Sequence, residues 1–143
     1  MKKVLACILI CVFLCPMVVA ASNAVAVKIN GEPVEFDVPA QIVEDRTMVP
    51  MRKIFETFSA EVAWIPEVQL ILAGKGDLMI ALQIGSPVMQ VTNIMTLEER
   101  FIELDVPPVI IGDRTLVPVR AISESLGMKV DWDEVTRTVL ITG

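Results

Sequence analysis

Two copies of an eight-residue motif, Asp-Arg-Thr-x-Val-Pro-x-Arg, form the densest signature in the chain, at residues 45–52 and 113–120. Each copy contains two arginines, and a guanidinium group binds a carboxylate or a sulfate through two parallel hydrogen bonds. The arginines are Arg46, Arg52, Arg114 and Arg120. One hypothesis is therefore that each copy forms an anion-recognition site.

The alternative is that these arginines stabilise the fold. The second arginine of each copy falls in the first turn of an expected helix, where the helix dipole disfavours a cation, so it requires a nearby acid. The candidate acids are Glu56 and Glu124 at i+4 on the same helices, and Asp37, Asp45, Asp105 and Asp113 in neighbouring turns and strands. Because the whole set occurs in both copies, we favour an Arg–carboxylate clamp that ties turn to helix.

Trp64 and Trp132 follow the two motifs at matching distances. A tryptophan can serve as a stacking platform for a ligand or as a large piece of the core. Each alternates with a valine, Val62 or Val130, on an expected strand. This alternation favours core packing over ligand binding.

Three acids, Asp131, Asp133 and Glu134, cluster after the second motif. Such a cluster could bind calcium or supply the two carboxylates of a glycosidase. The first copy has Ala63, Ile65 and Pro66 at the aligned positions, and the glycine-containing calcium loop of twelve residues is absent. We therefore interpret the cluster as a solvated turn.

The residue types that are missing limit the chemistry further. The chain has no histidine and no tyrosine, and its three cysteines, Cys7, Cys11 and Cys15, all lie near the N-terminus. Ser–His and Cys–His catalytic pairs therefore have no base. The imidazole and thiolate ligands of zinc, copper and haem sites are missing as well. The sequence predicts no catalytic residues, no metal site and no cofactor.

The motifs belong to a longer internal repeat. Residues 34–64 align without a gap onto residues 102–132 at an offset of 68, with 15 of 31 positions identical. Including the strands that follow, the two repeats extend over about residues 34–72 and 102–141. A repeat of this kind identifies the architectural unit, which here is half of a small domain used twice.

Each repeat is expected to run strand, strand, helix, strand, strand. Alternating residues predict strands at 34–38 and 102–106, and acidic turns follow at 44–45 and 112–113. The helices should begin at Pro50 and Pro118. Their apolar stripes are Met51, Ile54, Phe55 and Phe58 in the first, and Val119, Ile122 and Leu126 in the second, with Gly127 as C-cap.

The segment between the repeats is expected to hold strands at 78–84 and 88–91 around a Gly-Ser-Pro turn, followed by an irregular loop with one helical turn over 92–100. The expected fold class is α+β, with antiparallel sheet elements packed on two helices. No linker rich in serine or glycine separates the repeats, so we expect one domain over residues 25–143.

The residue pattern at the N-terminus predicts that the protein is exported. Lys2 and Lys3 precede an apolar run over residues 4–19, and small residues follow, which is the layout of a signal peptide over residues 1–24. The run is shorter than the roughly 20 residues that a spanning helix needs, so a retained anchor is less favoured, and so is a lipoprotein at Cys11 or Cys15. We expect no stable membrane span after cleavage.

Without Lys2 and Lys3 the chain has ten basic residues against 18 acidic ones. This balance argues against nucleic acid as a partner.

The pattern of residues 27–56, the Ile-Gly-Ser-Pro turn at 84–87, residues 104–141 and the two tryptophans resembles the copper amine oxidase N-terminal-like domain, or stalk domain. The resemblance covers about residues 27–141. It implies an antiparallel sheet wrapped against helices, on exported or cell-surface proteins of bacteria, and it transfers no catalytic residue.

The function expected from the sequence is that of a non-catalytic, exported cell-envelope module with a structural, interaction or spacer role. Its partner would be a protein or cell-wall component that the sequence leaves unknown. The alternative is a module that binds cell-wall glycan or peptide, and an enzyme is least favoured.

Overall fold

The computed structural model describes residues 24–143, so residues 1–23 of the expected signal peptide lie outside the described part. The strands are β1 (Ala26–Ile29), β2 (Glu32–Pro33), β3 (Gln41–Val43), β4 (Arg46–Pro50), β5 (Glu61–Ile65), β6 (Leu70–Lys75), β7 (Leu78–Gln83), β8 (Val88–Asn93), β9 (Glu99–Glu103), β10 (Val109–Ile111), β11 (Arg114–Pro118), β12 (Lys129–Asp133) and β13 (Thr138–Thr142). The helices are α1 (Met51–Thr57) and α2 (Val119–Ser125).

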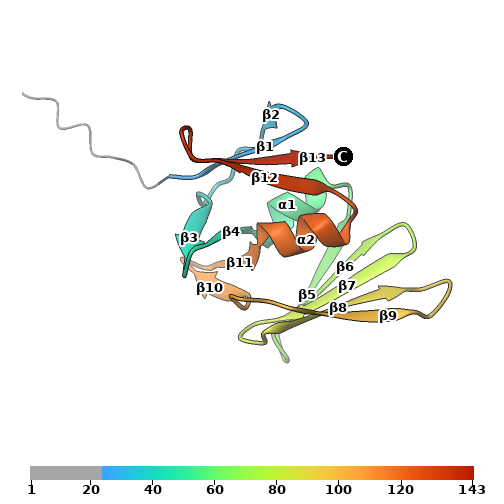
Figure 1. Ribbon diagram of the computed structural model, residues 1–143. Helices are drawn as coiled ribbons and strands as arrows, with labels where there is room; N and C mark the ends of the chain where they lie inside the picture. The colour runs from blue at the N-terminus through green and yellow to red at the C-terminus, as the bar shows by residue number, and fades with distance from the viewer. Residues whose placement is uncertain (1–23) are drawn as a thin grey trace, which may run out of the picture.

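The strands form three sheets. One has the order β12-β13-β1-β2, another β10-β11-β4-β3, and the largest β5-β6-β7-β8-β9. Figure 1 shows the two helices between the β12-β13-β1-β2 sheet and the β5–β9 sheet, with the β10-β11-β4-β3 sheet at their N-terminal ends. Strand β1 pairs in parallel with β13, so the N-terminal strand of the described chain completes the sheet that contains its last strand.

The β10-β11-β4-β3 sheet joins the two repeats. Each repeat supplies one hairpin, and the hairpins pair through β4 and β11, with Val49 opposite Val117 and with Pro50 and Met48 opposite Leu116 and Pro118. Each pair is converted into a pair of the same ladder when 68 is added to the β4 residue number and subtracted from the β11 residue number; Pro50–Leu116, for example, becomes Pro118–Met48. The sheet therefore has an approximate two-fold axis through Val49 and Val117, which we call the pseudo-dyad.

The helices form where the sequence predicts them. Pro50 and Pro118 directly precede α1 and α2, as expected for a residue whose missing N–H is not needed there. Each helix is followed, two residues after its end, by a residue with left-handed backbone, Ser59 at φ 59° and Gly127 at φ 81°. Each helix contacts both β4 and β11, so the helices cover the joint between the repeats.

One hydrophobic cluster extends through all three sheets and both helices. Ile54, Phe55 and Ile122 are fully buried in it, together with Ile71 of β6 and Ile141 of β13. The predicted stripes therefore face the core, although Leu126 is only partly buried. A smaller cluster of Met48, Val106 and Leu116 lies separately.

The expectation of an α+β fold is wrong. Strands account for 52% of the structure and helices for 12%, and each helix has only seven residues, or two turns. The apolar stripes predicted the helices but not their small share of the fold. Within residues 24–143, most strands pair with the next strand along the chain, but β1 pairs with β13 and β4 with β11. Local periodicity cannot reveal these two distant pairings.

Two local expectations are also wrong. Residues 34–38 do not form a strand, and in the second repeat strand β9 ends at Glu103, before a bend at 105–106. The chain bends at Asp37 and Asp105, where each carboxylate accepts a hydrogen bond from an arginine of the other repeat. The expected loop over 92–100 is instead the end of the β8–β9 hairpin, whose turn is held by backbone N–H groups bonded to the Asn93 side chain.

We predict that Ile54→Ala and Ile122→Ala each lower the free energy of unfolding by about 2–5 kcal/mol, because both remove a fully buried side chain from the same core. Denaturant titration measures the loss. Val135→Ala is the control, since Val135 is 94% exposed and its truncation should change stability by less than about 0.5 kcal/mol. Two isoleucine variants as stable as the parent would contradict a core shared by both helices.

Candidate functional site

The first residues of the motif form a tight turn in each repeat. Glu44 and Asp45 between β3 and β4, and Gly112 and Asp113 between β10 and β11, all have positive φ. Two such residues make the type I′ turn that suits the twist of a hairpin, and aspartate tolerates this backbone better than most residues. Asp45 and Asp113 therefore shape the hairpin, and among residues 24–143 their carboxylates form no ion pair.

The first arginine of each motif reaches across to the other repeat. Arg46 donates from Nε and Nη2 to Asp105 Oδ2 at 2.8 and 2.5 Å. Arg114 donates in the same way to Asp37 Oδ2 at 2.9 and 2.7 Å. Arg46 aligns with Arg114, and Asp105 aligns with Asp37, so the pseudo-dyad relates the two ion pairs to each other. We call them the reciprocal ion pairs.

Electrostatics at one of these pairs follow from its geometry. The hydrogen bond from Arg114 lowers the pKa of Asp37 below its ordinary value of 3.8, and the Val38 N–H, which donates to Asp37 Oδ1 at 2.9 Å, acts in the same direction. The carboxylate in turn raises the pKa of Arg114. All four side chains of the reciprocal ion pairs are about half exposed or more, so each pair lies at the protein surface.

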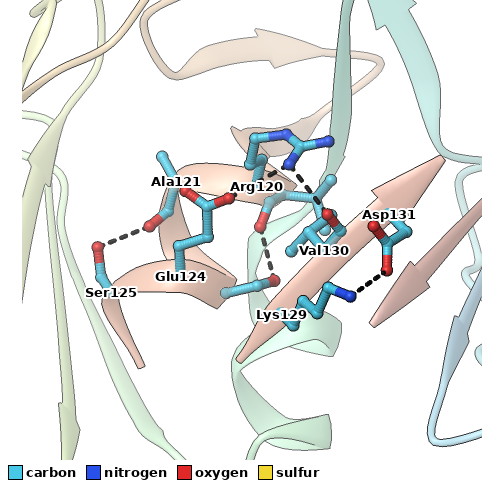
Figure 2. Close-up of polar contacts among 9 residues, drawn as sticks. Arg120, Ala121, Glu124, Ser125, Lys129, Val130 and Asp131 are labelled. Carbon is cyan, nitrogen blue, oxygen red and sulfur yellow. Dashed lines mark hydrogen bonds and ion pairs between the residues drawn. The ribbon is translucent and has the colours of Figure 1, made fainter. Parts of the chain in front are cut away.

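The second arginine behaves differently in the two repeats. Figure 2 shows Arg120 of α2, whose Nη1 donates to Glu124 Oε1 at 3.2 Å and to the Val130 carbonyl of β12 at 3.0 Å. In the first repeat, Arg52 forms no side-chain hydrogen bond or ion pair with any residue between 24 and 143, Glu56 included. The expected clamp from turn to helix is thus not what these arginines build.

Two clefts lie at the joint between the repeats. The first has a volume of about 630 Å³ and the second about 520 Å³. Each combines the helix start and the tryptophan of one repeat with the Asp-Arg-Thr turn of the other. The aligned residues that line both clefts include Asp37 and Asp105, Arg52 and Arg120, Trp64 and Trp132, Asp113 and Asp45, and Arg114 and Arg46.

Trp64 and Trp132 are partly buried, and each packs one side against the main core while lining a cleft with the rest. Core packing and access to a ligand, which the sequence analysis treated as alternatives, thus occur together. Trp132 donates its indole N–H to Glu134 Oε2 at 2.5 Å.

Of the three acids after the second helix, Asp131 and Asp133 lie in strand β12 and only Glu134 lies in the turn that follows, so the expected turn holds one of them. Asp133 Oδ1 accepts the backbone N–H groups of Val135 and Thr136, and these bonds, that from Thr136 above all, lower the pKa of Asp133. Asp131 pairs with Lys129 at 3.4 Å. Within the described residues 24–143, no three acidic or other metal-ligating side chains gather where they could hold an ion.

All four residues of the reciprocal ion pairs are among the candidates that the motif suggests, but the sequence did not indicate which acid each arginine binds. A usable signal was present, because Asp37 and Asp105 occur at the same 68-residue offset as the arginines. The clefts themselves were not foreseen, since they exist only where the two repeats meet.

The fold is thus a mostly antiparallel β domain with two short helices, built from two repeats joined through β4 and β11. The chain matches the model of the copper amine oxidase N-terminal domain over residues 28–141, and it belongs to that family. The family is a non-catalytic, stalk-type domain. No curated protein matches the chain. None of the helices in residues 24–143 has the length and hydrophobicity to cross a membrane.

We predict a measurable coupling between Arg46 and Asp105. Their side chains are 49% and 68% exposed, so solvent screens the pair, and a coupling energy of about 0.2–1 kcal/mol is expected. A double-mutant cycle with Arg46→Ala, Asp105→Ala and both together, followed by denaturant titration, measures it. A coupling energy of zero would show that the crossing contact does not hold the repeats together.

The second ion pair gives a prediction on pH. Because the folded-state pKa of Asp37 lies below 3.8, its pair contributes stability above that pH and loses it as the pH falls through the folded-state pKa. Arg114→Gln should raise the pKa of Asp37 towards 3.8, as followed by carboxyl carbon NMR. Arg120→Gln is the control and should leave it unchanged. An Asp37 pKa that stays low in Arg114→Gln would refute the assigned cause.

Proposed function

We propose that this protein is a non-catalytic module of the cell envelope, exported by its N-terminal segment, which spaces or presents other components there. The observation that carries the proposal is the joint between the repeats. The β4–β11 pairing, the shared core and the reciprocal ion pairs bind both halves of residues 34–141 into one body. A spacer needs a fixed distance between its ends, and a continuous core supplies that stiffness.

Membership of a non-catalytic, stalk-type family supports the same proposal. The absence of cysteine after Cys15 also fits. A domain that holds itself together through its core needs no disulfide outside the cell, provided the core is large enough. The 22 buried residues of the main cluster extend through every sheet.

Export is supported by the sequence of residues 1–24 alone. The two lysines, the apolar run and the small residues Ala20, Ala21 and Ser22 form the three regions of a cleavable signal. A protein of this composition, with 18 acidic residues and no basic cluster, would remain soluble at a negatively charged wall or membrane surface rather than bind it.

A second candidate function is the binding of a wall glycan or peptide. The specific observation in its favour is that both tryptophans, though packed on the core, also line clefts that are open to solvent. An aromatic face beside charged side chains is the usual make-up of a site for a polar ligand.

We predict that the protein isolated from the envelope or medium of its native host begins between Ala21 and Val25. Signal peptidase would remove the preceding residues after a small side chain. N-terminal sequencing and intact mass measure this. Protein that keeps Met1 and stays in the cytosolic fraction would overturn the export proposal, and Met1 retained in the membrane fraction would replace cleavage with anchoring.

A further inference from the structure

The two clefts share aligned pairs of lining residues but differ in their hydrogen bonding. In the second cleft the polar groups satisfy one another, because Glu134 accepts the Trp132 indole N–H and Arg120 is bonded to Glu124 and Val130. The cleft therefore offers a ligand few free donors. Arg120 holds α2 against β12, and Arg46 of the same cleft is paired with Asp105.

The first cleft lacks these internal partners, and the reason lies in the sequence. Pro66 stands where the second repeat has Glu134, and Ala63 stands where it has Asp131. A proline side chain cannot accept a hydrogen bond. Within residues 24–143, the Trp64 indole N–H consequently has no acceptor, while part of the ring lies on the core and the rest lines the cleft.

Asp37 and Arg114, which also line this cleft, are paired with each other, but two charged groups of α1 beside Trp64 are not paired. Arg52 and Glu56 occupy the same helical spacing as the bonded Arg120 and Glu124, yet among the described residues they form no pair with each other or with any other side chain. Lys53 adds an ammonium group where the second repeat has Ala121. The arginine and glutamate at these aligned positions are thus bonded within the protein in the second repeat and available to a ligand in the first.

From this contrast we infer that the first cleft is a binding site for a pyranose ring of a glycan. The indole face suits the apolar C–H face of a sugar ring. Arg52, Glu56 and Lys53 would exchange hydrogen bonds with its hydroxyl groups, which both donate and accept. The volume of about 630 Å³ falls within the range of small-ligand sites.

The charges of the cleft select against other ligands. The cleft is lined by three cationic residues, Arg52, Lys53 and Arg114, and by four acidic ones, Glu35, Asp37, Glu56 and Asp113. A polyanion such as nucleic acid would therefore meet repulsion as well as attraction. Groups of both signs around an aromatic face suit a neutral, hydroxyl-rich ligand. This inference rests on the second candidate function, ligand binding, and is independent of export and spacing.

The two tryptophans give a built-in comparison for the test, because the chain has no others. Chitotetraose and cellotetraose, two neutral tetrasaccharides that differ in their acetamido groups, are titrated into isotope-labelled mature protein. The indole N–H signals are followed by NMR, with Trp64→Phe assigning them. We expect one sugar or both to shift the Trp64 signal in a saturable manner below about 10 mM, and the Trp132 signal to remain in place.

Matched variants exploit the pseudo-dyad. Arg52→Ala should weaken binding by about tenfold, whereas the aligned Arg120→Ala should leave it unchanged. Pro66→Glu gives the first cleft the acceptor of the second, and it should engage the Trp64 N–H and weaken the sugar. Circular dichroism confirms that each variant is folded.

Three outcomes would overturn the inference. They are no shift of the Trp64 signal with either sugar, equal shifts of both tryptophan signals, or equal loss of binding in Arg52→Ala and Arg120→Ala. A short peptide with a free carboxylate is titrated in parallel. If it shifts Trp64 and the sugars do not, the cleft binds peptide and the second candidate function survives in that form.

Discussion

The pairing of β4 with β11 is the contact on which the rest of this structure depends. It buries Val49 against Val117 on the pseudo-dyad and sets the Asp-Arg-Thr turn of each repeat beside the bend of the other. The reciprocal ion pairs, the position of both helices and the two clefts all follow from that single register. A shift by one residue would turn every side chain of one strand to the opposite face and remove all of them together.

Duplication also explains why charged residues are retained at the surface of the joint. An exposed ion pair contributes little to stability, but two pairs related by the pseudo-dyad favour one arrangement of the hairpins over displaced ones. Asp37 and Asp105 also favour this arrangement. The chain bends at each of them, and each carboxylate accepts hydrogen bonds from an arginine of the other repeat. The motif is thus structural in its first half, through the turn and the crossing arginine.

The second half of the motif shows how a duplicated fold can take on different tasks. Arg120 and Trp132 are bonded within their own repeat, and their counterparts Arg52 and Trp64 are not. Pro66 occupies the position that aligns with Glu134 of the second repeat, so the first cleft lacks the internal hydrogen-bond acceptor of the second. Membership of a non-catalytic family is compatible with such a cleft, because binding requires placed donors and acceptors but no reactive group.

The sequence by itself determined the local features: the repeat, the hairpin turns at 44–45 and 112–113, the two helices with their buried stripes, the strands on either side of the Gly-Ser-Pro turn, and the family. Each depends on residues close together in the chain, through turn chemistry or a helical or strand period. Only the tertiary structure decided the mostly β fold, the bend at Asp37, the partners of Arg46 and Arg114, and the clefts. These depend on contacts between distant residues, such as Asp37 and Arg114, which are 77 positions apart in the sequence, and the paired strands β1 and β13. No local pattern encodes such a distance, and it becomes fixed only when the two repeats pair.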